Sequence, residues 1–150
     1  HLSLRRQRQM CIRDRISEGF FTTSDIGHLK DGKLVIDGRA DDVIITGGEN
    51  ISLAAIDSVL SKNFPDIRTA AFAVDDQQWG QALHIAITST EVGDEEISRT
   101  LEKEFGKAGK PKGFLHISEI PLMGIGKVDR LALVKLQLSQ LLKVRPEGSH

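Results

Sequence analysis

Several side chains of the sequence have types and spacing that could do chemistry, and Lys127 is the first of them. It follows two glycines in the run Gly124-Ile125-Gly126-Lys127. Glycines allow a backbone to approach a ligand closely, and a lysine ammonium on such a loop can stabilise a developing anion. The spacing alone leaves two interpretations open: a catalytic lysine, or a solvated lysine of a surface loop.

The lysine loop matches neither of the common phosphate-binding motifs. A P-loop has Gly six positions before the Lys and Ser or Thr directly after it, and these positions hold Pro121 and Val128. The dinucleotide-binding fingerprint also fails, because Asp129 stands where its third Gly belongs. The sequence has no Gly-x-Ser-x-Gly elbow either, so a self-contained hydrolase is not expected.

Charged residues in the first third of the chain are further candidates for binding a nucleotide. Asp25 follows Thr22-Thr23-Ser24, where its carboxylate could accept hydrogen bonds from ribose hydroxyls or could equally cap a turn. Arg39, Asp41 and Asp42 follow Gly38, and a solvated linker is the default interpretation of this cluster.

A glycine pair and a lone tryptophan complete the candidates. The run Gly47-Gly48-Glu49-Asn50 predicts either a loop that approaches a ligand or a tight turn into the following helix. Trp79 is the only tryptophan and lies in a polar segment, so it either stacks on a ligand ring or covers the edge of the core.

No metal site is expected from the sequence. His28, His84 and His116 lack the spacing of metal ligands, and all three are predicted to be structural. The single cysteine, Cys11, excludes an internal disulfide and a Cys-based zinc site, and it favours a reducing, cytoplasmic setting.

Composition predicts one soluble globular domain. The chain has 150 residues, 39% of them hydrophobic and 27% charged, a size that can bury a core without disulfides or metals. No apolar run approaches the roughly 20 residues of a membrane-spanning helix, so no membrane partner is expected.

Charge is distributed unevenly along the chain. Residues 1–15 hold five arginines and one aspartate, a net charge of +4, and the chain's total of −1 leaves −5 for the remainder. A weakly acidic body argues against a nucleic-acid-binding face, because contacts with phosphates need clustered cations. The basic head is either an arm for nucleic acid or anionic lipid, or a segment foreign to the domain.

The hydrophobic pattern predicts an α+β fold class, with an N-terminal β-hairpin and a small mixed sheet on which about three helices pack. The Asp31-Gly32 pair predicts the hairpin turn. Helices are expected to begin at Ser52, Asp94 and Asp129. Strands are expected at residues 20–23, 26–30, 33–36, 43–46, 67–74, 82–88 and 114–117. The expected organisation is a head (1–16), a hairpin and hinge segment (17–40), a main domain (41–142) and a disordered tail (143–150).

Taken in order, four segments resemble motifs of the adenylate-forming superfamily, which contains acyl- and aryl-CoA ligases. Residues 20–25 are similar to its Tyr/Phe-x-Thr-Gly-Asp motif, and residues 38–51 to its hinge and the loop after it. Residues 75–81 resemble its Asp-x-x-x-Trp-Gly-Gln/Glu segment, and residues 121–130 its Pro-x-x-x-x-Gly-Lys-x-x-Arg catalytic-lysine motif. The resemblance covers about residues 17–138 and identifies the chain as the C-terminal lid domain of such an enzyme.

The resemblance implies a role for each candidate residue. Lys127 would bridge the substrate carboxylate and the α-phosphate or ribose oxygens, Asp25 would hold the ribose hydroxyls with Arg39 near the same nucleotide, and Asp41 would be the hinge. The remaining candidates would form the pantetheine tunnel of CoA: Gly47, Gly48, Glu49 and Asn50, with Trp79 nearer the CoA end.

The resemblance also implies ligands and partners. ATP and Mg²⁺ would be bound mainly by an N-terminal adenylation domain, CoA would be the co-substrate, and a carboxylic acid would be the substrate. Within the superfamily, residues 38–42 and 124–130 are most similar to the o-succinylbenzoate-CoA ligases. The lid alone is expected to be inactive. Two other hypotheses stay open: a stand-alone module of the same fold that binds a nucleotide or a protein, and a nucleic-acid binder that uses the basic head.

Overall fold

A computed structural model of the chain describes residues 16–17, 20–21, 25–39 and 42–144. The chain divides into two compact units, residues 1–41 and residues 42–150. The predicted head up to residue 15, the residues 22–24 before Asp25, the proposed hinge Asp41 and the last six residues of the tail lie outside the described residues.

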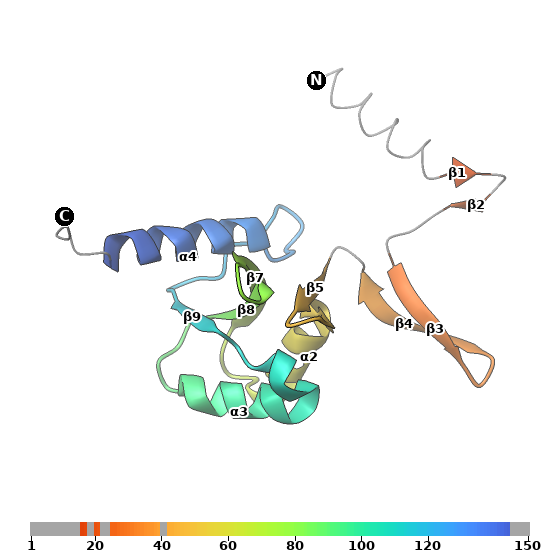
Figure 1. Cartoon of the computed structure of the whole chain (residues 1–150), viewed down its shortest axis with the longest axis horizontal. Coiled ribbons are helices and arrows are strands. Elements are labelled where there is room, and N and C mark those ends of the chain that lie inside the picture. The colour runs from red at the N-terminus through yellow and green to blue at the C-terminus, as the bar shows by residue number, and fades with distance from the viewer. Residues whose placement is uncertain (1–15, 18–19, 22–24, 40–41, 145–150) are drawn as a thin grey trace, which may run out of the picture. The chain divides into compact units, whose positions relative to one another are not determined.

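The described part of the first unit contains two antiparallel strand pairs (Figure 1). One is short, β1 (Ile16–Ser17) with β2 (Phe20–Phe21), and the other is the hairpin of β3 (Asp25–Lys30) and β4 (Lys33–Arg39). Asp31 and Gly32 both have positive φ, 52° and 74°, as a primed two-residue turn requires. The predicted hairpin is therefore confirmed. Its described side chains are all exposed, including Leu29 and Leu34.

The second unit is built on a mixed five-stranded sheet. Its strands are β5 (Val43–Thr46), β6 (Glu49–Ser52), β7 (Thr69–Asp76), β8 (Gly80–Ile87) and β9 (Gly113–His116). The order is β6-β5-β8-β7, and β9 pairs in parallel with β8, whereas every other pairing is antiparallel. One edge of β8 is thus shared, because Gly80 pairs with Thr46 of β5 while residues 84–87 pair with β9.

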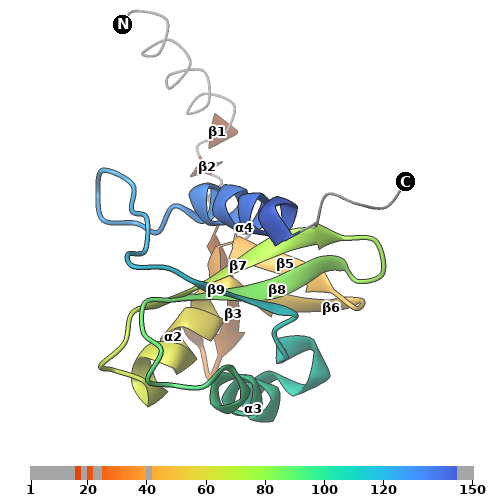
Figure 2. The ribbon, with the colours of Figure 1, turned by 90° about the vertical axis from the view of Figure 1, so that its left-hand side faces the viewer.

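Helices cover both faces of this sheet. They are α2 (Leu53–Asn63), α3 (Asp94–Phe105), the short 3-10 helix η2 (Gly106–Gly109) and α4 (Arg130–Val144). Figure 2 shows α4 on one face and α2 with α3 on the other. The architecture confirms the predicted α+β class of a hairpin, a mixed sheet and three main helices. Within the described chain, no helix is long and apolar enough to cross a membrane.

Alternation along the strands divides the core into two layers, because successive strand residues point to opposite faces. On β7, Phe72 belongs to the cluster beneath α4, whereas its neighbour Ala71 belongs to the cluster shared with α2 and α3. The first cluster includes Leu133 of α4, and the second includes Ile56 of α2 and Leu101 of α3, all fully buried.

The strand β6 was not predicted. The sequence suggested that Gly47-Gly48 ends a strand and leads into the helix, but the chain first returns along β5, with Ile51 buried opposite Ile44. Gly47 and Gly48 have φ of 58° and 84°, the positive values that a two-residue hairpin turn demands. The predicted helix start is confirmed, since the Ser52 hydroxyl accepts a hydrogen bond from the Ala55 N–H at 3.2 Å.

Candidate functional site

Lys127 lies on an exposed loop, residues 121–129, that closes on itself through backbone hydrogen bonds. The Met123 N–H donates to the Lys127 carbonyl at 2.6 Å, and the Gly126 N–H donates to the Met123 carbonyl at 2.8 Å. At the base of the loop, the Asp129 N–H donates to the Pro121 carbonyl at 2.9 Å. The lysine is therefore presented by a hairpin-like loop with its own internal bonding.

The loop runs directly into the first turn of α4, where Asp129 is the N-cap. Its carboxylate accepts from the Ala132 N–H at 2.9 Å, and its carbonyl accepts from the Leu133 N–H at 3.2 Å. The first bond satisfies an amide that lacks a partner within the helix, and the second is the first bond of the helix itself. Leu133 is fully buried against the sheet, so the end of the lysine loop is attached to the core.

Arg130, three residues after Lys127, connects this helix start to three other parts of the unit. Its Nη2 donates to Asp57 Oδ2 of α2 at 3.0 Å, its Nε donates to Asp42 Oδ1 at 3.5 Å, and its Nη1 donates to the Ala71 carbonyl of β7. The Ala71 N–H in turn donates to Asp57 Oδ1 at 2.7 Å. We call Arg130, Asp42 and Asp57 the arginine cluster.

The arginine cluster is largely shielded from water. The side chains of Arg130, Asp42 and Asp57 are 20%, 15% and 26% exposed. Burial raises the pKa of the Asp57 carboxyl above its ordinary value, while the Ala71 N–H and the Arg130 guanidinium act against that shift. One guanidinium therefore serves two carboxylates and a carbonyl in a partly desolvated site.

The Gly47-Gly48 turn and Trp79 lie against each other, although they are 32 residues apart in the sequence. The Gly47 N–H donates to the Trp79 carbonyl at 3.0 Å, and a Cβ placed on Gly47 would lie 3.0 Å from the Trp79 ring. Close by, the Ile45 N–H donates to the Gln81 side-chain oxygen at 3.0 Å. Gly47, the first of the predicted CoA-loop residues, is thus in direct contact with the predicted tryptophan.

Two charged residues also contact Trp79. The carboxylate of Asp76 accepts from the Gln78 and Trp79 amides at 2.8 and 2.9 Å, which fixes the turn. The ammonium of Lys112 lies 3.9 Å from the centroid of the tryptophan ring, within the range of a cation–π contact. Trp79 as a whole residue is 36% exposed, so part of it is open to solvent.

Asp25 and Arg39, the predicted nucleotide-binding residues, are brought together in the first unit. They are register partners at the open end of the β3–β4 hairpin, and both are exposed. Lys127 belongs to the second unit.

Several residues of these sites were not singled out from the sequence. Asp57 and Lys112 gave no local signal, and Gln81 and Arg130 entered only as the last positions of two motifs. His84, predicted to be structural, lies in β8 opposite Gly113, where an added Cβ would be 2.5 Å from the imidazole. Among the described residues, no three His, Cys, Asp or Glu side chains are grouped so as to hold a metal ion.

Comparisons with known proteins show that the chain is similar to CoA ligases. No family model matches the chain. It is 33% identical to a 2-succinylbenzoate–CoA ligase of Bacillus licheniformis over 79% of the chain and 25% of that protein. It is 35% identical to a sulfoacetate–CoA ligase of Cupriavidus necator over 78% of the chain and 24% of that protein.

A solved structure adds the fold to this relationship. The o-succinylbenzoate CoA synthetase of Bacillus subtilis, in complex with its acyl-adenylate intermediate, superimposes with a TM-score of 0.71 at 25% identity. The match covers 92% of this chain and 27% of the synthetase. The chain thus spans about a quarter of the length of the relatives it matches.

Proposed function

We propose that this chain serves as the moving lid of an acyl-CoA ligase. The chain belongs to the adenylate-forming superfamily of such ligases and corresponds to their C-terminal domain. In this role it supplies a catalytic lysine for one half-reaction and a CoA-binding surface for the other. Its partner is the N-terminal adenylation domain of the same enzyme.

The reaction has two steps. A carboxylate of the acid substrate attacks the α-phosphate of ATP, which gives acyl-AMP and releases pyrophosphate. The thiol of CoA then attacks the acyl carbon and displaces AMP, which gives the thioester. ATP and the Mg²⁺ that neutralises its phosphates are held mainly by the N-terminal domain, and Asp25 and Arg39 contribute to the nucleotide site.

Lys127 has the setting that the first step needs. It is exposed, and its loop is closed by backbone hydrogen bonds and continuous with the capped start of α4. A positive charge held in place near the α-phosphate stabilises the transition state without having to reorganise during the reaction.

The position of the second surface supports a rotating lid, and this observation carries the proposal. Figure 2 shows the loop before α4 at one end of the second unit and the β5–β6 turn at the other. One active site cannot face both ends at once. Rotation about Asp41 between half-reactions would present first Lys127 and then the surface of Gly47, Gly48, Glu49, Asn50 and Trp79.

For the second step, Trp79 and Lys112 suit the nucleotide end of CoA. The exposed part of the aromatic ring can stack on a base, and the ammonium beside it attracts phosphate. We further propose that the acid is o-succinylbenzoate, which would place the enzyme in menaquinone biosynthesis in the cytoplasm. The names of two of the relatives and the motif similarity favour this substrate.

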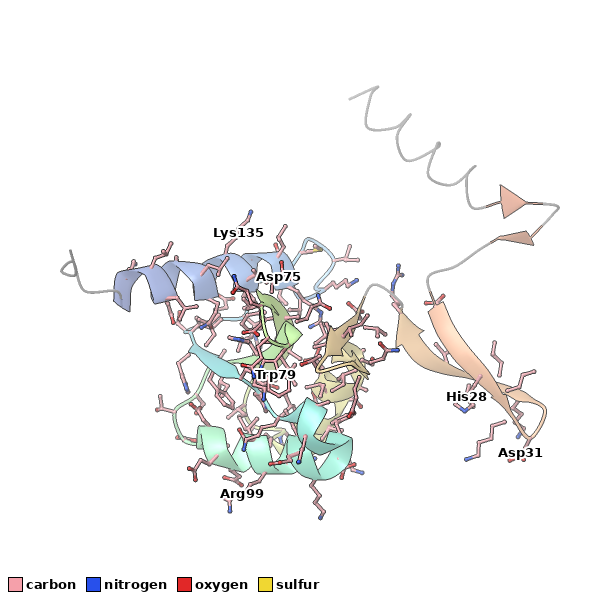
Figure 3. All side chains as sticks on the ribbon, in the orientation of Figure 1. His28, Asp31, Asp75, Trp79, Arg99 and Lys135 are labelled. Atoms are coloured by element: carbon pink, nitrogen blue, oxygen red, sulfur yellow. The ribbon has the colours of Figure 1, made fainter. Side chains whose placement is uncertain are left out.

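The test adds the 150-residue chain in trans to the N-terminal domain of a 2-succinylbenzoate–CoA ligase. Pyrophosphate release reports acyl-AMP formation, and thioester formation from supplied acyl-AMP reports the second step. Lys127→Ala should slow the first step about 10²- to 10³-fold and leave the second nearly unchanged. Lys135→Ala is the matched control, because Lys135 points away from the sheet on the outer side of α4 (Figure 3).

An unchanged first step in the Lys127 variant would refute the role of this lysine. Calorimetry of the isolated chain with ATP, AMP and CoA addresses the alternative of a stand-alone binding module. Tight binding by the chain alone would favour that alternative, because a lid without its partner domain has only half of the site.

A further inference from the structure

We infer that Arg130 is a positioning residue for Lys127, an inference that rests on the proposed function. Its guanidinium fixes the start of α4, and with it the end of the lysine loop, to the residue that follows the proposed hinge. The structure joins these segments although Asp42 and Arg130 are 88 positions apart.

The arrangement uses the geometry of arginine. Its three nitrogens donate to three acceptors on three different segments: Asp42 before β5, Asp57 on α2 and the carbonyl of Ala71 on β7. A planar guanidinium holds such a set in fixed directions, whereas a lysine ammonium is a point charge on a flexible stem. Lysine at position 130 would keep the charge and lose the simultaneous contacts.

The location of the arginine cluster suits positioning. Arg130 is three residues from Lys127, and Asp42 directly follows Asp41, about which the lid is proposed to turn. When the lid rotates, Lys127 reaches a defined place only if the loop keeps its position relative to the hinge. A misplacement of about 1 Å can cost on the order of 10²-fold in rate.

The test compares Arg130→Lys with Arg99→Lys in the same chain. Arg99 is an exposed arginine on α3 that points away from the body of the unit (Figure 3) and donates only to the Glu95 carbonyl among the contacts identified for it. In the assay in trans, Arg130→Lys should slow acyl-AMP formation about 10- to 100-fold while thioester formation from supplied acyl-AMP stays within about twofold of the parent. Arg99→Lys should change neither step.

A double-variant cycle separates positioning from general stability. If Arg130 acts through Lys127, adding Arg130→Lys to Lys127→Ala should not slow acyl-AMP formation further. The inference would be overturned if Arg130→Lys slowed both half-reactions equally. It would also be overturned if the double variant formed acyl-AMP more slowly than Lys127→Ala by the same factor by which Arg130→Lys alone slows the parent. Should Arg130→Lys fail to fold, Asp42→Ala removes one of the three contacts and takes its place.

A measurement that does not depend on enzyme activity distinguishes the positioning role of Arg130 from the proposed function of the chain. Amide hydrogen exchange of Asp129 and Ala132, which flank Arg130 and are bonded in the loop base and the cap, should quicken at least about tenfold in Arg130→Lys and not in Arg99→Lys. Unchanged exchange would overturn the inference even where the lysine proves catalytic. If exchange quickens in Arg130→Lys but Lys127→Ala forms acyl-AMP as fast as the parent, the proposed function is refuted instead.

Discussion

Alanine at Gly47 should destabilise the protein more than alanine at Gly48, because only the first position has a side chain against it. Both residues have positive φ, 58° and 84°, so the two variants share the same kind of backbone cost. A Cβ on Gly47 would lie 3.0 Å from two carbons of the Trp79 ring, whereas a Cβ on Gly48 would have no other residue within 4 Å.

The expected magnitudes follow from these two terms. A left-handed conformation costs an alanine about 1–2 kcal/mol, which is the whole effect expected for Gly48→Ala. At Gly47 the carbon–carbon distance is also well below the usual 3.5–4.0 Å, and relieving such overpacking costs about 1–3 kcal/mol. Trp79 is partly exposed and can yield, so we expect about 1 kcal/mol more for Gly47→Ala than for Gly48→Ala.

The assay is urea unfolding of both variants, followed by circular dichroism and by the fluorescence of Trp79, the only tryptophan of the chain. The Gly47 variant should also shift the fluorescence emission of the folded protein. In the parent protein the ammonium of Lys112 lies 3.9 Å from the centroid of the Trp79 ring, and a displaced ring would lose this contact. Equal losses of stability with unchanged emission would refute the contact between the turn and the tryptophan.

Two further predictions concern the sheet around β8. Lys112→Met should lower the free energy of unfolding by about 0.5–1 kcal/mol and change the fluorescence emission of Trp79. The control Lys110→Met, in the same segment, should leave the emission unchanged. If the Lys112→Met protein has the same emission spectrum as the parent, the cation–π contact is contradicted. Burial lowers the pKa of His84 below its ordinary 6.5, although Gln137 opposes the shift. Below about pH 6.5 the imidazole therefore takes up a proton when the protein unfolds. The free energy of unfolding should fall as the pH drops through this range, by at most about 1.4 kcal/mol per pH unit. Urea titrations from pH 5 to 8 should show a shallower fall for His84→Leu, and parallel curves would contradict this assignment.

Local signals explain why much of the fold was predictable. The Asp31-Gly32 turn, the Ser52 cap and the Asp129 cap each act within a few residues, so their geometry follows from residue type. The same holds for the helical spacing that buries Leu53, Ile56 and Leu60 on one side of α2. Motif order then gave the family, because four spaced segments resembled one superfamily.

Long-range contacts explain what the sequence did not provide. Strand β6 has little apolar alternation, and its identity depends on the pairing of residues 49–52 with β5. The contact of Gly47 with Trp79 exists because β8 begins beside the end of β5, at the Gly80–Thr46 pair. Nothing near Asp57 in the sequence indicates that Arg130 lies beside it, since the topology of the sheet joins them.

The arginine cluster also provides hydrogen-bond partners for backbone groups on the edge of the sheet. These bonds explain how one set of residues links the two layers of the core. Among the described strands, β7 pairs only with β8, so its other edge has backbone groups without a strand partner. At Ala71 both groups are satisfied by side chains, the N–H by Asp57 of α2 and the carbonyl by Arg130 of α4. Helices on opposite faces are thereby joined at a single residue of the edge strand. A lid that must bring Lys127 to a defined place after rotation needs such a connection, because slippage of α4 against the rest of the unit would misplace the lysine in the first half-reaction.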